Sequence, residues 1–236
     1  MGISELPKTY IEYSIQKLRN QNLMTIVDRN IPDEMRDTTI VCDTRDLVGW
    51  KIVPSTVTDQ ELNELEKHLG LKYPPLYRAF LQSYHFYELG ELRFCSHALH
   101  NWRHKLEEIY KDYSRLIKIG LIPFAEESLM DAGAVCFDTR FREDNGDCPV
   151  VFWDHEWVGT DKEIRPLFSN SEAMFRCLTF MAQSTLDFIY HDEECDDSSV
   201  LPAKRDLLSQ FLALDPTGAG GAARDYWTTW GVVASE

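Results

Sequence analysis

Apolar residues recur every three or four positions in the first part of the chain. Ile11, Ile15 and Leu18 lie at the spacing of a single helical face, so we predict a helix near the N-terminus. The polar stretch at residues 28–39 predicts a loop. We therefore interpret residues 1–55 as an N-terminal extension that precedes the main fold.

Two short helices joined by a pair of prolines are predicted next. Thr58 and Glu61 form a capping-box pattern, in which each side chain binds the other residue's free backbone N–H. Gly70 can end the first helix in the left-handed conformation, and Pro74 and Pro75 preset the backbone for the second. The side chains expected to be buried on these helices are Leu62, Leu65, Leu69, Leu76, Tyr77, Phe80, Leu81 and Tyr84.

Short strand-like segments dominate the middle of the chain, with one helix expected over residues 98–118. Residues 150–153 show no polar alternation, which predicts an internal strand that is covered on both faces. Pro123 favours a sheet edge or a strand end for its own segment. The predicted strands are residues 89–95, 121–124, 133–138, 150–153 and 164–168.

Helical patterns return towards the C-terminus. A helix containing Phe175 and Leu178 is followed by an acidic connector at residues 187–197, and a helix around Phe211 precedes a glycine-rich turn at residues 218–221. Helices first, then consecutive strands with helices around them, favour an α+β fold over a wound parallel sheet. The predicted parts are the extension at 1–55, an α+β core at 56–182, and an acidic connector with a helical C-terminal extension at 183–236.

The chain carries 39 acidic and 24 basic residues, a net charge of −15. Such a charge repels nucleic acid, whose phosphates bind clustered Lys and Arg, and it attracts a basic protein partner. Solubility alone is the other interpretation of the charge. No apolar run reaches the roughly 18 residues of a membrane span. With no signal-peptide pattern at the N-terminus, we expect a cytoplasmic protein with no membrane partner.

Cysteine and histidine give weak signals for chemistry. The six cysteines include no CxxC pair, and we expect Cys136 and Cys148 to pack as small apolar residues with reduced thiols. His97, His100 and His104 are spaced to share a helix face, but they lack the additional ligands that a zinc site requires. An exposed helix face is the preferred interpretation and a metal site the alternative. We expect no cofactor and no catalytic residue.

Acidic residues cluster in three predicted loops, where they could be solvated, contact a partner, or hold a hard cation through oxygen ligands. Asp154 and His155 could be an acid–base pair, but neighbouring strand residues point to opposite faces. Trp157 beside carboxylates has the composition of an interface hot spot. We expect Trp157, Asp154, Glu156 and the acids at 143, 144 and 147 to share one side of the sheet, because they leave adjacent strands near residues 150–153. The candidate partner-binding residues are Glu126, Glu127, Asp131, Glu143, Asp144, Asp147, Asp154, His155, Glu156 and Trp157.

The order of these motifs resembles the SUKH superfamily of the Smi/Knr type. The motifs are the helix–Tyr-Pro-Pro–helix at residues 58–81, Ile-Pro-Phe at 122–124, Cys-Phe-Asp at 136–138, and Pro-Val-Val-Phe-Trp-Asp-His-Glu at 149–156. The resemblance implies a curved, mainly antiparallel sheet flanked by helices. Residues 83–87 read Ser-Tyr-His-Phe-Tyr where many members have Asn-Gly-Gly or Ser-Gly-Gly, so no binding role is carried over to that turn.

The resemblance also implies a function that needs no reaction. Its best-known members are bacterial immunity proteins, which bind and silence toxin domains. We therefore expect a non-catalytic immunity protein, and the acidity favours a basic toxin domain such as a nuclease as its partner. One alternative is an intracellular scaffold like the fungal members, which are linked to cell-wall regulation. The other is a metal-dependent hydrolase that uses the acidic loops.

Overall fold

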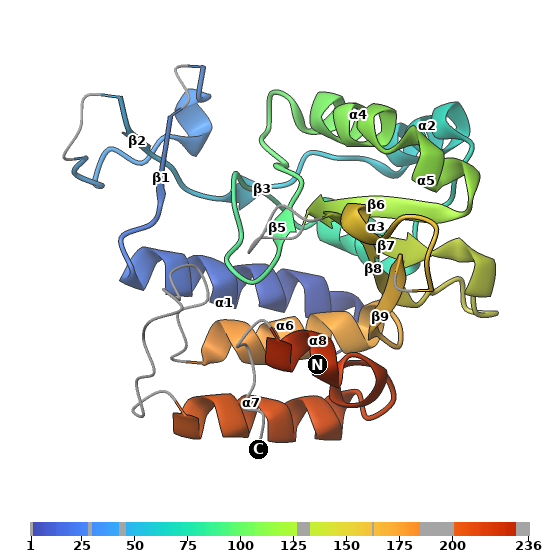
Figure 1. The fold of residues 1–236 in the computed structure, drawn as a ribbon. Coiled ribbons are helices and arrows are strands. Elements are labelled where there is room, and N and C mark those ends of the chain that lie inside the picture. The colour runs from blue at the N-terminus through green and yellow to red at the C-terminus, as the bar shows by residue number, and fades with distance from the viewer. Residues whose placement is uncertain are drawn as a thin grey trace.

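The protein is described by a computed structural model that covers residues 2–27, 30–42, 46–126, 133–161, 163–184 and 201–229. It combines helices with antiparallel sheets, as the α+β prediction requires (Figure 1). The helices are α1 (Leu6–Asn20), α2 (Asp59–Leu69), α3 (Pro75–Leu81), α4 (Trp102–Asp112), α5 (Ser114–Lys118), α6 (Ser171–Gln183), α7 (Leu201–Leu214) and α8 (Arg224–Thr229). The strands are β1 (Thr25–Ile26), β2 (Val48–Gly49), β3 (Val53–Pro54), β4 (Tyr84–His85), β5 (Arg93–Phe94), β6 (Leu121–Glu126), β7 (Gly133–Asp138), β8 (Val150–Asp154) and β9 (Ile164–Phe168).

The predicted ends of α2 and the start of α3 are confirmed. Thr58 Oγ1 accepts a hydrogen bond from Glu61 N at 3.2 Å, and Glu61 Oε2 accepts one from Thr58 N at 2.8 Å. Gly70 follows α2 with φ of 67°, a conformation that glycine adopts without a Cβ penalty. Pro75 occupies the first turn of α3, where its missing N–H costs nothing.

The main sheet is a five-stranded antiparallel meander in the order β5-β6-β7-β8-β9. Pro123 was expected at an edge or a strand end, yet β6 lies between β5 and β7. The internal position is tolerated because β5 pairs only with Ala125 and Glu126, and a register shift follows Pro123. The missing N–H of Pro123 therefore removes no hydrogen bond to β5.

Both faces of this sheet are packed. One face contributes Phe124, Phe137 and Phe152 to the large core, together with α1, α3 and α6. The other face contributes Cys136 and Trp153 to a smaller cluster beneath α5. Every residue of β8 is buried, which confirms the prediction of an internal strand covered on both faces.

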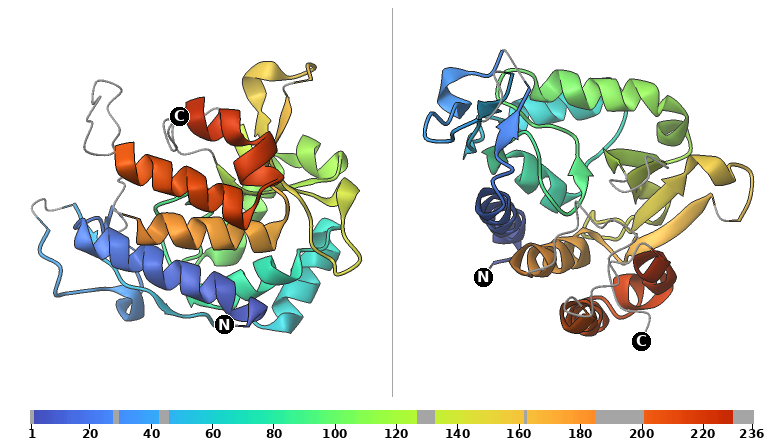
Figure 2. Two further views of the ribbon diagram at one scale, coloured as in Figure 1. Left: turned by 90° about the horizontal axis from the view of Figure 1, so that it is seen from below. Right: turned by 60° about the vertical axis from the view of Figure 1, so that its left-hand side comes forward.

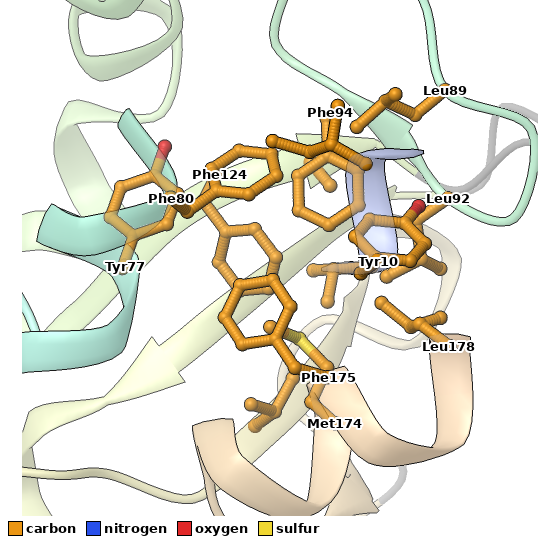
Figure 3. Packing of buried hydrophobic residues seen from close by; sticks show 14 of the residues in the cluster. Tyr10, Tyr77, Phe80, Leu89, Leu92, Phe94, Phe124, Met174, Phe175 and Leu178 are labelled. Carbon is orange, nitrogen blue, oxygen red and sulfur yellow. The ribbon is translucent and has the colours of Figure 1, made fainter. Parts of the chain in front are cut away.

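The large core is built around aromatic rings from helices and strands that are far apart in the sequence (Figure 3). Phe80 of α3 lies 4.8 Å from Phe94 of β5 and 5.6 Å from Phe175 of α6, measured between ring centroids. Tyr10 of α1 lies 5.8 Å from Phe94 and 6.0 Å from Phe175. The N-terminal helix is therefore packed into the same core as the sheet.

Helices α1, α6 and α7 lie side by side in one layer (Figures 1 and 2). None of the helices in the described ranges combines the length and apolar character needed to cross a bilayer. The polar stretch predicted as a loop at 28–39 includes a short 3₁₀ turn, Asp33–Met35, whose Met35 is buried. The division into a core with two extensions stays a prediction, although both flanking parts contribute side chains to one cluster.

The helix predicted over residues 98–118 is shorter and is divided into α4 and α5. It begins at Trp102 and not at residue 98, because Asn101 has a non-helical conformation with φ of −144°. The preceding His97 is paired with Phe86 through two backbone hydrogen bonds of 3.0 and 3.3 Å. Tyr113 adopts a non-helical conformation between α4 and α5. The strand predicted at residues 89–95 is also shorter in the structure. Only Arg93 and Phe94 pair with β6, and they form β5.

The C-terminal segment is attached through one buried carboxylate. Asp215 is 2% exposed and accepts hydrogen bonds from Ser169 N at 3.0 Å, Gly218 N at 3.1 Å and Ala219 N at 2.9 Å, as well as from the Ser169 hydroxyl. A Cβ on Gly218 would lie 2.3 Å from both Asp215 Oδ2 and Ser169 N, so only glycine fits there. The predicted glycine-rich turn is a π-helical turn, Gly218–Ala222, that closes over this contact.

We expect Asp215→Ala to lower the free energy of unfolding by about 3 kcal/mol, because it leaves several buried N–H groups without an acceptor. Chemical denaturation measures the change. Asp206→Ala, at an exposed position of α7, is the matched control and should change stability by less than about 0.5 kcal/mol. Equal stability of the two variants would show that the Asp215 contacts do not hold the C-terminal segment.

Candidate functional site

The candidate residues divide between opposite ends of β8. Trp153 pairs with Ala134, which in turn pairs with Glu126, and these residues mark one end of the sheet. Val150 pairs with Phe137 at the other end, which is where the loop containing Glu143 enters β8. We call these the Trp157 end and the Arg142 end, after the loop residue that each presents. The described acidic residues therefore do not converge on a single rim of the sheet.

Trp157 is displayed on a firmly held turn. The 3₁₀ turn His155–Trp157 follows β8 directly, and the Trp157 side chain is 43% exposed beside Val158, which is 40% exposed. Asp154 Oδ1 accepts from Glu156 N at 3.0 Å at the start of the turn. His155 and Glu156 are exposed on the same turn.

Glu163 closes the far side of the turn. Its two carboxylate oxygens accept from Trp153 Nε1 at 3.0 Å and from Gly159 N at 2.7 Å, and Arg115 lies 3.3 Å away. The Gly159 and Trp153 hydrogen bonds, with Arg115 nearby, lower the pKa of Glu163 below its ordinary value, so its charge persists at neutral pH. The turn is thus pre-organised before any partner arrives.

Two of the candidate acids are buried and already bonded within the protein. Asp154 Oδ2 lies 2.6 Å from Arg165 Nη2, and the Asp154 side chain is 5% exposed. Asp147 Oδ1 accepts from Ser171 N at 3.1 Å and from Cys148 N at 2.8 Å, close to the first turn of α6. Both carboxylates therefore hold structure, and their charges face internal donors.

The remaining acids have different surroundings. Glu143 and Asp144 are exposed at the Arg142 end, and Glu143 accepts hydrogen bonds from Asn145 and Asn170. Glu126 is half-buried at the Trp157 end, with Arg93 at 4.0 Å. Glu127 and Asp131 lie outside the described residues.

A groove of about 510 Å³ lies beside Glu126, between α4 and the segment that carries β5. Its walls mix the apolar side chains of Leu89 and Ile109 with charged groups that include Glu88 and Lys105. Burial raises the pKa of the Cys95 thiol in this groove to about 12, so the thiol stays protonated and is a poor nucleophile. The groove therefore offers contacts and charges, with no activated cysteine.

The three histidines do not share a helix face as expected. His97 and His100 precede α4, and only His104 lies within it, where its Nε2 is 3.2 Å from Glu108. His97 is buried, because its segment pairs with Phe86 before the helix begins. Within the described ranges, no group of three or more His, Cys, Asp or Glu residues is placed to hold a metal ion.

His97 instead stacks on His85, which the sequence reasoning did not single out. The ring centroids are 4.9 Å apart. Thr56 N donates to His85 Nε2 at 3.0 Å, so His85 Nδ1 carries the proton and donates to His97 O at 3.0 Å. His97 Nε2 donates to Leu81 O at 2.8 Å. These bonds assign the neutral Nδ1–H tautomer to His85 and place a proton on Nε2 of His97.

The sequence contains one clue to this pair. His85 stands in the run Tyr-His-Phe-Tyr, where aromatic neighbours indicate burial, and this run replaces the glycine-rich turn of many SUKH proteins. Burial and the neighbouring His85 ring lower the pKa of His97 to about 3, and burial also lowers the pKa of His85. The rings serve the packing of β3, β4 and the segment before α4.

The pair predicts a specific loss of stability in acid. Because an unfolded histidine has a pKa of about 6.5, the unfolded chain takes up the proton before the folded chain does. The contribution of the neutral histidines to the free energy of unfolding is therefore complete above about pH 6.5. It decreases as the pH falls towards 3, by up to about 1.4 kcal/mol per pH unit for His97. Urea denaturation across this range should show a shallower dependence for His97→Gln, whereas His104→Gln should match the wild type. An unchanged slope in His97→Gln would contradict the assignment.

A protein-family model matches the central part of the chain. No curated protein matches the chain. The model of the SMI1/KNR4 family (SUKH-1) matches residues 56–177, which run from just before α2 into α6 and make up about half of the chain. The resemblance inferred from the proline-linked helices and the strand motifs is confirmed, and the antiparallel sheet with flanking helices agrees with it. The chain therefore belongs to the SMI1/KNR4 family (SUKH-1).

Proposed function

We propose that this protein is an immunity protein that binds a basic toxin domain and neutralises it without catalysing a reaction. Proteins of this family are generally non-catalytic immunity or regulatory proteins, and the family suggests protein–protein interaction. In the proposed mechanism the bound protein covers the toxin's active site or the route to its substrate. No bond is made or broken.

The observation that carries the proposal is the exposed Trp157 on its pre-organised turn. Hot spots of protein interfaces are enriched in tryptophan, and a side chain that is already held loses little entropy on binding. Asp154 and Glu163 hold the turn from within, so they support the contact without touching the partner. Glu156 and His155 flank the tryptophan as exposed polar residues.

The charge of the chain supports a basic partner. A net charge of −15 attracts a positively charged domain over a distance and accelerates the encounter. A nuclease domain fits this description, because its phosphate-binding surface is basic and carboxylates can occupy the positions of the phosphates. Glu126 and Glu156 at the Trp157 end are the carboxylates that we assign to this role.

The second candidate is a regulatory scaffold, which the family description supports equally. The two functions differ in the partner and not in the fold. A toxin reading frame beside the gene, and a toxin captured by pull-down from the native strain, would support immunity. A captured signalling or cell-wall protein with no toxin would support the scaffold and contradict immunity.

We expect Trp157→Ala to weaken binding of the captured partner by about 2 kcal/mol while the protein stays folded. Titration calorimetry measures the affinity, and circular dichroism follows the fold. Tyr13→Ala, which removes an aromatic side chain of similar exposure (42%) from α1, is the matched control and should bind normally. A Trp157→Ala protein that unfolds, or that binds as well as the control, would refute the proposed surface.

We also expect the association rate constant to fall steeply with ionic strength. Long-range attraction is screened beyond about 8 Å at physiological salt, whereas the dissociation rate depends mainly on short-range contacts. Surface plasmon resonance at increasing sodium chloride separates the two rate constants. An association rate that does not change with salt would mean that the net charge serves solubility only.

A further inference from the structure

A second groove lies at the Arg142 end of the sheet, on the side away from Trp157. It has a volume of about 660 Å³ and runs between the C-terminal end of α2 and the turn that joins α5 to β6. Its apolar floor is formed by Leu71, Ile117 and Ile122, and its other lining residues include Lys67, Lys72 and Arg142. None of the candidate acids at the Trp157 end lines this groove.

The charge of this groove is opposite to that of the chain as a whole. Glu66 is the one acidic residue in its lining, and its side chain is only 2% exposed. Arg78 at 2.9 Å and Lys72 at 3.3 Å pair with Glu66, which also accepts from Tyr73 N at 3.0 Å, and Arg78 pairs with the exposed Asp59 as well. The accessible charge of the groove is therefore positive, in a protein that carries −15 overall.

Arg142 is held in place by two backbone carbonyls, and among the described residues no ion pair joins it to a carboxylate. Its Nη1 donates to Gly146 O at 2.5 Å and its Nη2 donates to Lys72 O at 2.5 Å. These bonds orient the guanidinium, and neither acceptor carries a negative charge. The nearby exposed Glu143 is bonded to Asn145 and Asn170.

Two exposed apolar side chains adjoin residues of the groove lining in the sequence. Thr139 and Gly120 both line the groove, and Thr139 donates to Gly120 O through both its backbone N and its hydroxyl, each at 2.8 Å. Ile119, which is 40% exposed, precedes Gly120, and Phe141, which is 67% exposed, precedes Arg142. The Arg140 guanidinium lies 5.7 Å from the centre of the Phe141 ring and is paired with the buried Asp138.

We propose that this groove binds an acidic segment of a second protein partner. The segment would place its carboxylates at Lys67, Lys72 and Arg142 and an apolar side chain against Phe141. A water-exposed phenylalanine next to arginines has the composition of interface hot spots, and a small anion would not need it. The partner differs from the basic one proposed for the Trp157 end, because charge complementarity is reversed.

Stabilisation of helix ends does not account for all of the basic residues in the groove or for the exposed Phe141. Lys67 lies in the last turn of α2, where a cation interacts favourably with the helix dipole. Lys72 and Arg142 lie outside the helices, and Phe141 contributes nothing to a helix dipole. A partner that contacts both the basic residues of the groove and the exposed Phe141 explains why they occur together.

The proposal can be tested with a labelled peptide of repeated Glu-Glu-Leu units added to the full chain. Fluorescence anisotropy should show saturable binding, with little binding of the uncharged Gln-Gln-Leu peptide. Lys67→Gln combined with Lys72→Gln should weaken binding about tenfold or more, and Phe141→Ser should do so independently. These changes leave Arg78 in place to neutralise Glu66, so the fold should be retained.

The control variant combines Lys8→Gln with Arg205→Gln, which removes the same charge from exposed positions on α1 and α7. It should bind the acidic peptide like the wild type. The proposal would be overturned if the control variant lost as much affinity for the peptide as the Lys67 and Lys72 variant. It would also be overturned if peptide binding did not saturate, or if inorganic phosphate alone competed fully with the peptide. A homodimer would also overturn the proposal if sedimentation detects it in the wild type and the Lys67 and Lys72 changes abolish it. A second copy of the chain would then be the occupant of the groove.

The outcome is independent of the function proposed for the Trp157 end. Trp157→Ala should leave binding of the acidic peptide unchanged, because Trp157 lies at the opposite end of β8. Conversely, the Lys67 and Lys72 changes should leave the affinity for the basic partner unaffected at physiological salt.

Discussion

The fold depends on one cluster of aromatic rings that joins elements far apart in the sequence. Phe124 and Phe137 stack on the sheet with centroids 4.1 Å apart, and Phe80 brings α3 onto the same cluster. Tyr10 and Phe175 add the N-terminal helix and α6. Large rings bury much apolar area and tolerate few alternative arrangements, so this cluster determines how helices and sheet are oriented. Changes within it would affect the parts inside and outside the family match together.

Among the described residues, both faces of the central strands β7 and β8 are packed, so the ends and edges of the sheet are the parts open to a partner. The Trp157 end presents an aromatic residue on a turn that internal hydrogen bonds hold in place. The Arg142 end presents cations and an exposed phenylalanine. The packed strands form a rigid scaffold that keeps the loops at its two ends apart, and it is these loops that contact partners. Two partners of opposite charge could therefore be held at once.

The net charge gives an incomplete account of the surface. Asp147, Asp154 and Asp215 are buried, and their oxygens accept from backbone N–H groups or pair with arginine. Glu91 is also buried, with Ser14 Oγ at 2.7 Å and Lys17 at 3.8 Å, and burial raises its pKa. These carboxylates connect segments of the chain. Their oxygens are not available for direct contact with a partner, which meets the exposed acids instead.

Local signals in the sequence were sufficient for the ends of α2, the start of α3, the order along the chain of the strands in the main sheet and the family. A capping box, a left-handed glycine and a proline at a first turn act within a few residues, so neighbouring residues determine them. The internal position of β8 could also be predicted. A strand in which apolar and polar residues do not alternate is usually buried on both faces.

Only the tertiary structure decided which polar residues remain available to a partner. The sequence places Asp154 and Trp157 three positions apart and distinguishes neither, yet Arg165 from β9 buries the first while the second faces solvent. His97 was expected on a helix face and became buried because its segment pairs with Phe86 and its ring stacks on His85. The candidate acids were divided between two ends by strand register, and the basic groove joins segments about 70 residues apart, as the Arg142–Lys72 contact shows. Such contacts arise from long-range packing, which no local pattern of residues encodes.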